Sequence, residues 1–145
     1  MARRKRVHTL ASFVVKKSPG RGKGVFANVR IGKGETIGYY TGDILRDWHS
    51  TREPYNTSLY LMYVCKDHWI NAVGPRSNYT RYINHSYRPN AELIVSTRWK
   101  TARIESSLSQ LSRKILRIRL LMRLYWSFTG DSSQESHLVL LMLNY

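Results

Sequence analysis

Hydrophobic and β-branched residues gather along this chain in short runs, and glycine, proline or a polar cluster closes each run. Runs of this length are typical of strands, because a helix needs a longer apolar repeat. The runs recur roughly every ten residues, with little helical periodicity before residue 100, so the sequence predicts a mostly β domain of small curved sheets. The clearest strand-like runs are residues 13–15, 36–40, 59–65, 69–72 and 93–96.

Two glycine-rich stretches and one polar stretch separate these runs. Residues 20–27 hold glycine at three alternate positions, which permits positive φ and lets a ligand approach the backbone closely. No G-x-x-G follows, and the Lys-Ser/Thr ending of a phosphate-binding loop is missing, so the stretch predicts a hairpin and no nucleotide fingerprint. Residues 30–35 form a second glycine-rich turn, and the polar residues 46–58 predict a loop or irregular insert.

Residues 81–90 are the most informative part of the chain. Asn84, His85 and Ser86 follow an apolar-aromatic step, and Pro89 prevents a helix from continuing through them. Asn and Ser bond to nearby backbone groups, so composition alone predicts a polar turn between strands. The order of these residues is more informative than their composition, because it matches a known sequence motif.

Four segments resemble, in the same order, the motifs of SET-domain protein-lysine methyltransferases. Each resemblance is weak alone, but four in sequence, with the last nearly complete, are specific. Together they cover about residues 12–104 and imply a SET-like fold. Residues 17–27 resemble the Gly-x-Gly-apolar-Phe motif, 31–35 the apolar-x-Lys-Gly turn, 39–43 the Tyr-x-Gly-acid strand end, and 70–86 the Ile-Asp-Ala…Gly-Asn…Arg-Phe-Ile-Asn-His-Ser run.

The resemblance implies S-adenosylmethionine as the cofactor, lying between the glycine hairpin and the Asn-His pair. Main-chain groups of the hairpin would contact it, the Asn84 amide would bind its amino-acid end, and the His85 backbone its adenine. An amide suits a zwitterion because it offers a donor and an acceptor together. The implied cofactor contacts are Gly22, Lys23, Gly24, Asn84 and His85.

The same resemblance places Tyr40 in the narrow channel that receives the target lysine, as the candidate catalytic residue. Methyl transfer needs a neutral amine aligned with the sulfonium methyl and stripped of water. Desolvation supplies that neutral amine by lowering the pKa of lysine. This step needs no metal. Cys65 is the single cysteine, and Tyr87 stands where the family often has a zinc-binding cysteine, so we expect no metal site.

The resemblance ends near Ile104. The family's acid-acid-apolar-x-aromatic-Asp-Tyr segment has no counterpart in residues 105–145. Residues 114–124 fit either a basic amphipathic helix or, at 116–120, a strand. We therefore divide the chain into a basic tail (1–11), a SET-like domain (12–104) and an atypical segment (105–145), helical or disordered. A shifted reading frame or a truncation after Ile104 is a hypothesis that explains both halves.

Length, charge and composition set the remaining limits. The 145 residues suffice for one domain, and 42% hydrophobic residues exclude a disordered composition. No apolar run is long enough to span a membrane. The net charge of +15 favours polyanions, so nucleic acid is an expected non-specific partner of the basic surface. Residues 3–6 fit a nuclear-localisation or nucleic-acid-contacting tail, or equally a solvated basic terminus. We expect the nucleus and chromatin as the location, with the cytoplasm as the alternative.

Three hypotheses follow. The first is a methyltransferase for a lysine-containing protein substrate, with a histone tail as the family's habit suggests. The second is a catalytically inactive SET-like module that binds a peptide or cofactor, and the third is a basic nucleic-acid-binding protein that shares only local turns. The first two require the glycine hairpin and the Asn-His corner to lie together in space.

Overall fold

Strands are the main regular secondary structure of the fold, as the sequence predicts. The computed structural model describes residues 5–107, 110–111 and 116–118. Three short helical segments join the strands there: the 3₁₀ segments η1 (Leu10–Ser12) and η2 (Tyr79–Tyr82) and the α-helix α1 (Asp47–Ser50). The strands are β1 (Phe13–Lys17), β2 (Lys23–Ala27), β3 (Ile31–Gly32), β4 (Thr36–Tyr39), β5 (Asp43–Leu45), β6 (Leu61–Cys65), β7 (His68–Asn71), β8 (Asn84–His85), β9 (Ala91–Ser96), β10 (Thr101–Ser106), β11 (Gln110–Leu111) and β12 (Arg117–Ile118).

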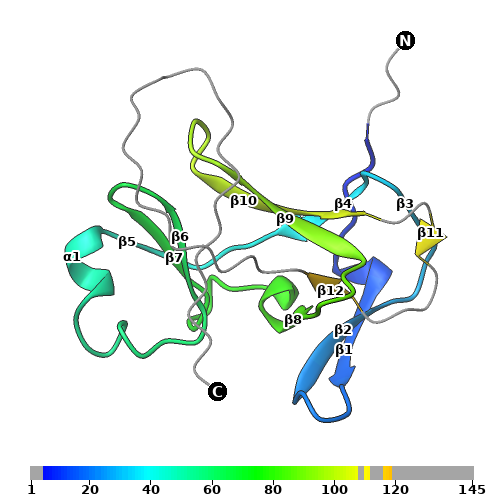
Figure 1. The fold of residues 1–145 in the computed structure, drawn as a ribbon, viewed down its shortest axis with the longest axis horizontal. Helices are drawn as coiled ribbons and strands as arrows, with labels where there is room; N and C mark the ends of the chain where they lie inside the picture. Colours follow the sequence, from blue (N-terminus) through cyan, green and yellow to red (C-terminus); the bar gives the residue numbers. More distant parts are fainter. Residues whose placement is uncertain (1–4, 108–109, 112–115, 119–145) are drawn as a thin grey trace.

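In the described residues these strands form four small sheets (Figure 1). The largest runs in the order β4-β10-β9-β12-β8, and a three-stranded sheet runs in the order β5-β7-β6. The β1–β2 hairpin is a two-stranded sheet of its own, and β11 pairs with β3. Nearly all pairs are antiparallel, while β12 runs parallel to β8 and β9. The fold is thus an assembly of small sheets and not one continuous sheet.

The core lies where these sheets meet. In β9, Ala91, Leu93 and Val95 are buried at alternate positions, as expected for a strand with one face toward the core. Ile104 of β10 pairs with Leu93 and is fully buried. The buried apolar cluster comprises Phe13, Val25, Ala27, Ile31, Ile37, Tyr40, Met62, Val64, Ile70, Ala72, Ile83, Ala91, Leu93, Val95, Ala102, Ile104 and Leu116.

The polar stretch 46–58, predicted as a loop, begins with the short helix α1. A single four-residue turn leaves no periodic signal in the sequence. Its position is fixed by Asp47, whose carboxylate accepts hydrogen bonds from Trp69 Nε1 at 2.8 Å and from the backbone N–H of Asp67 at 3.1 Å. The rest of the stretch forms turns, in agreement with the prediction.

Residues 116–118 add a strand to the central sheet. β12 lies between β9 and β8, and its register pairs Arg117 with Asn84 and Ile118 with His85. Leu116 is fully buried, and its backbone N–H donates to the carbonyl of Val25 at 2.7 Å. The strand alternative is therefore confirmed for this short part; the remainder of 114–124 lies outside the described residues.

Candidate functional site

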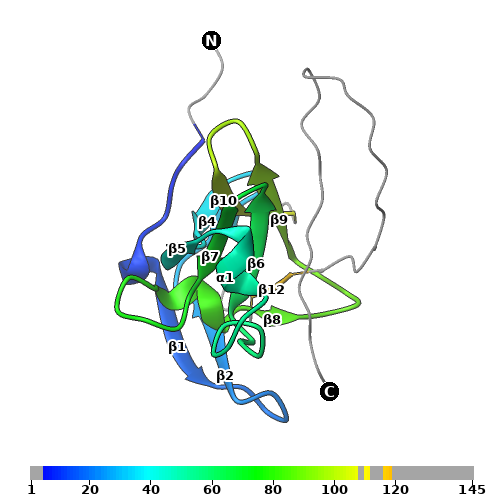
Figure 2. The same cartoon turned by 90° about the vertical axis from the view of Figure 1, so that its left-hand side faces the viewer.

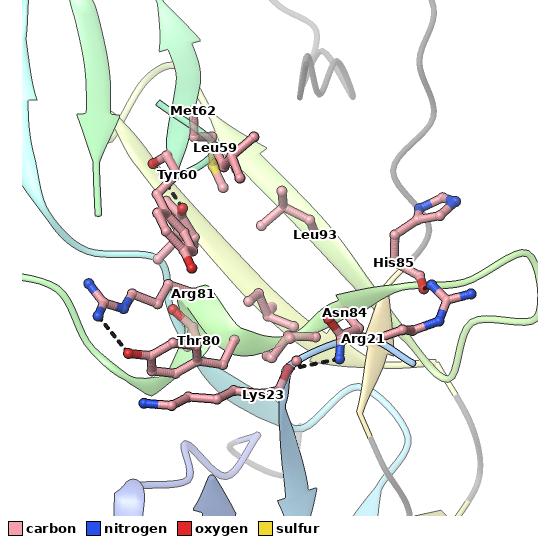
Figure 3. Close-up of a pocket in the computed structure, with 15 residues that line it drawn as sticks. Arg21, Lys23, Leu59, Tyr60, Met62, Thr80, Arg81, Asn84, His85 and Leu93 are labelled. Carbon is pink, nitrogen blue, oxygen red and sulfur yellow. Dashed lines mark hydrogen bonds between the residues drawn. The ribbon is translucent and has the colours of Figure 1, made fainter. Parts of the chain in front are cut away.

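One cavity of about 490 Å³ opens between the β1–β2 hairpin, η2, β8 and the segment that leads into β6 (Figure 3). Figure 3 shows Leu59, Tyr60 and Met62 at one end, and Arg21 and His85 at the other. Sites for small molecules and cofactors commonly have volumes of roughly 300 to 1,000 Å³. The lining residues are Arg21, Gly22, Lys23, Tyr40, Leu59, Tyr60, Met62, Thr80, Arg81, Tyr82, Ile83, Asn84, His85, Leu93 and Ile104.

The tip of the hairpin is shaped by two glycines. Gly20 and Gly22 have φ of +68° and +65°, which other residues adopt only with strain. The backbone N–H of Ser18 donates to the carbonyl of Gly22 at 2.7 Å and closes the turn. A Cβ at either glycine would meet no atom within 4 Å, so conformation and not crowding explains both glycines.

Two hydrogen bonds join this hairpin directly to the Asn-His corner. Asn84 Nδ2 donates to the carbonyl of Lys23 at 3.0 Å, and Arg21 Nη1 donates to the carbonyl of His85 at 2.8 Å. The partners are 61 and 64 residues apart in sequence. The expected proximity of the two segments is thereby confirmed.

The corner is held in place by the residues just before it. Asn78 accepts a hydrogen bond from the backbone N–H of Thr80 at 3.0 Å and so caps η2. Its Nδ2 also donates to the carbonyl of Tyr39 at 2.9 Å, which ties η2 to the end of β4. Tyr79 donates its hydroxyl proton to the carbonyl of Ile37, and burial raises its pKa to about 12. These contacts fix the backbone that leads into Asn84.

Tyr40 lies at the buried side of the cavity, with 8% of its surface exposed. Its hydroxyl donates to the carbonyl of Tyr60 at 2.9 Å. Burial raises the pKa of Tyr40 well above its ordinary value, and the nearby Tyr60 adds to that effect. The phenol is therefore protonated and neutral at physiological pH, with lone pairs on its oxygen available to a ligand.

Arg81, on η2 beside the hairpin strand β2, organises part of the cavity wall through stacking. Its guanidinium lies over the Tyr82 ring at 4.7 Å and near the Tyr60 ring at 5.3 Å, measured from Cζ to the ring centroids. It also donates to the hydroxyl of Tyr82, which lowers the pKa of that tyrosine. Lys23 Nζ approaches the same ring at 5.2 Å. Cations and aromatic rings alternate along this side of the cavity.

The structure brings most of the predicted site residues together. Gly22, Lys23, Asn84 and His85 line the cavity with Tyr40, whereas Gly24 is buried one residue farther along β2 and lies outside the lining. Sequence reasoning missed the further contributors Arg21, Tyr60, Arg81 and Tyr82. Arg21 lies between Gly20 and Gly22, and Arg81 is the first residue of the motif that contains Asn84 and His85. Their positions in these motifs could have indicated both. No local pattern marks Tyr60.

Metal and membrane features can be stated for the described part alone. Within residues 5–107, 110–111 and 116–118, no group of three or more His, Cys, Asp and Glu side chains could hold a metal ion. No helix in that part is long and apolar enough to cross a membrane.

Comparison with known proteins identifies the family. The SET domain model matches residues 22–113, well over half of the chain. The chain therefore belongs to the SET domain family, and the predicted membership is confirmed.

Three related proteins show how similar the chain is to known members of the family. The chain is 35% identical over 82 residues to the mouse histone-lysine N-methyltransferase NSD3, a match that covers 52% of this chain and 6% of the relative. It is 33% identical over 78 residues to the human histone-lysine N-methyltransferase, H3 lysine-36 specific (50% and 3%). It is 35% identical over 95 residues to the variant-silencing SET domain-containing protein of Plasmodium falciparum (59% and 4%). The chain spans less than a tenth of the length of each relative.

Proposed function

We propose that this chain binds S-adenosylmethionine and methylates the side chain of a lysine in a protein substrate. The observation that carries the proposal is the meeting of the hairpin and the Asn-His corner, distant in sequence, across one cavity. Membership of the SET domain family supports the same reading.

The residues around the cavity fit this cofactor. The Asn84 amide has a second N–H and an oxygen besides the N–H bonded to Lys23, so it can serve a zwitterionic amino-acid end. The main chain of residues 22–23 is accessible because the glycine has no side chain. His85 would contribute its backbone, and we expect its ring to take no part as a base. When bound, S-adenosylmethionine supplies the electrophilic methyl group.

The other end of the cavity suits a desolvated amine. Leu59, Met62 and Leu93 present apolar surface there, beside Tyr40. An apolar surrounding lowers the pKa of a lysine ε-amine and so favours its neutral, nucleophilic form. The neutral hydroxyl of Tyr40 can orient that amine, because its own proton is already donated to Tyr60.

We infer a histone-tail lysine as the substrate and chromatin as the location. Two of the relatives described above have names that specify histone-lysine methylation. The basic residues 3–6 are in keeping with a nuclear protein. A basic enzyme repels a basic tail during approach, so we expect the rate of encounter to rise with ionic strength.

Calorimetry with S-adenosylmethionine, followed by transfer of a labelled methyl group to histone H3 peptides, tests the proposal. We expect saturable cofactor binding and label on a peptide that contains lysine, with none on the same peptide carrying arginine in its place. Absence of cofactor binding would contradict the cavity assignment.

The inactive SET-like binding module is the second candidate. Residues 105–145 lack the Asp-Tyr segment that the family resemblance leads one to expect, and this favours it. Cofactor binding without methyl transfer to any lysine peptide would support this candidate over the first.

A further inference from the structure

The β1–β2 hairpin extends away from the rest of the described fold, as two perpendicular views show (Figures 1 and 2). Its strands pair only with each other among the described residues, in a register from Phe13–Ala27 to Lys17–Lys23. The base of the hairpin is anchored by buried Phe13, Val25 and Ala27. The distal half carries no buried apolar side chain beyond Val25, and its Arg21 and Lys23 contact the cavity wall.

The charge of this hairpin has one sign. The first 34 residues contain ten of the 24 Lys and Arg residues and none of the nine Asp and Glu residues. Four of these cations lie on the hairpin, and all are exposed: Lys16, Lys17, Arg21 and Lys23. Within the part of the chain that the structure describes, no carboxylate forms an ion pair with any of them.

The arrangement of these cations is unfavourable for folding by itself. Lys17 and Lys23 are direct cross-strand partners on one face of the ribbon. Like charges directly opposite each other on neighbouring strands destabilise a hairpin. Lys16 projects from the other face, with its Nζ 4.5 Å from the centre of the Phe26 ring. Positive charge thus covers both faces, and a polyanion would relieve the repulsion.

We propose that the β1–β2 hairpin binds duplex DNA through its phosphates. A two-stranded ribbon is one of the two elements that the roughly 12 Å wide major groove of B-DNA admits. Single-stranded nucleic acid is a poorer match, since it is bound by exposed aromatic rings, and here Phe13 is buried and Phe26 lies under Lys16. Duplex RNA is also a poorer match because its major groove is deep and narrow.

Fluorescence anisotropy of the full chain with a labelled DNA duplex, over a series of salt concentrations, tests the proposal. The affinity falls as salt rises, and each lost phosphate contact makes the negative slope of log affinity against log salt shallower by about one. The variant Lys16→Gln/Lys17→Gln should bind more weakly, with a slope smaller by about two. These lysines lie outside the proposed cofactor site, so S-adenosylmethionine binding should remain unchanged and the outcome is independent of the proposed enzyme activity.

The matched control is Lys66→Gln/Lys100→Gln, which removes the same charge from exposed turns outside the hairpin. The control should keep the wild-type slope, and neither variant should melt below the wild type, since removing Lys17 relieves its repulsion with Lys23. An unchanged slope in the hairpin variant would overturn the proposal. So would equal affinity for duplex RNA or for polyglutamate, with an equal loss in the variant, because the partner would then be any polyanion.

Discussion

The side-chain amide of Asn84 donates to the backbone carbonyl of Lys23 over 3.0 Å, although 61 residues separate the two. Asn84 begins β8 and Lys23 begins β2, so this bond joins two strands that belong to different sheets. Figure 3 shows the bond at the edge of the cavity, beside Arg21. One amide therefore fixes the cavity wall and lies where the proposed cofactor would bind.

Asn84→Ala removes both roles. We expect the affinity for S-adenosylmethionine to fall at least tenfold, which corresponds to about 1.4 kcal/mol. The physical reason is the loss of a donor and acceptor pair together with a looser hairpin. Calorimetry measures the change, and Asn56→Ala, in an exposed turn after α1, is the control that should bind normally. Wild-type affinity in Asn84→Ala would place the cofactor elsewhere.

Gly42 is needed for packing. A Cβ built there would lie 2.2 Å from the carbonyl oxygen of Asn71 and 2.5 Å from its carbonyl carbon, both backbone atoms of β7. Backbone cannot move aside as a side chain can, so Gly42→Ala should destabilise the fold by about 1 to 3 kcal/mol, or more if the strand shifts. A thermal melt should show a lower midpoint, by roughly 3 to 4 °C per kcal/mol for a chain of this length.

Gly74→Ala is the control for that measurement. Its Cβ would meet the Oδ2 atom of Asp43 at 2.7 Å, the end of a partly exposed side chain that also pairs with exposed Arg76. Because that carboxylate can rotate away, we expect a much smaller shift of the melting midpoint. Equal shifts in the two variants would contradict the packing argument.

Local pattern predicted the strands well, because β-branched runs and glycine turns act within a few residues. The run at 59–65 shows the limit: the strand begins at Leu61, and Leu59 is 53% exposed. The first two residues of the run, Leu59 and Tyr60, line the cavity and do not belong to the strand. Hydrophobicity alone does not distinguish a strand residue from a residue of a cavity wall.

The site was predicted through ordered motifs and not through chemistry visible in one segment. The place of Arg81 in the motif could have marked the residue, but its contacts could not be predicted. Its guanidinium bonds to the carbonyls of Ala72 and Val73 at 2.8 and 2.9 Å and stacks on Tyr60, and these partners come from two separate turns. Such contacts depend on the tertiary fold, so no spacing in the sequence encodes them.

Acid should weaken the attachment of the N-terminal segment. Glu35 Oε2 lies 2.8 Å from His8 Nε2 and accepts from the backbone N–H of Gly32 at 2.8 Å. The hydrogen bond with His8, and then that from Gly32, lower the pKa of Glu35 below its ordinary value. A carboxylate with a depressed pKa stabilises the fold fully above its ordinary pKa and loses that contribution as pH falls through the folded value.

Melting temperatures of Glu35→Gln and the wild-type chain, compared from pH 7 downward, measure this contribution. The wild type should be more stable at pH 7, and the difference should shrink below about pH 4.5. Glu53→Gln, at an exposed position in the turns after α1, is the control and should melt close to the wild type at pH 7. A difference for Glu35→Gln that persists at pH 3 would indicate packing as the cause and not charge.

Tyr40→Phe tests the proposed catalytic role without disturbing the cofactor wall. Phenylalanine keeps the buried ring in the core, while the hydroxyl that bonds to the Tyr60 carbonyl is lost. We expect methyl transfer to slow about tenfold to a hundredfold, as for the loss of one oriented polar group at a reacting centre. Affinity for S-adenosylmethionine should stay within about twofold, since the predicted cofactor contacts lie on other residues.

Tyr39→Phe supplies the control, because Tyr39 precedes Tyr40 on the chain but is exposed. Successive residues of an extended strand point to opposite faces, so this variant removes an equivalent hydroxyl outside the cavity and should transfer methyl groups at the wild-type rate.

Burial raises the pKa of Tyr40, so its hydroxyl stays protonated through the neutral range. The rate of Tyr40→Phe should therefore keep the wild-type pH profile between about pH 7 and 9, only lower. A changed profile would mean that Tyr40 acts by exchanging a proton, which contradicts a purely orienting hydroxyl.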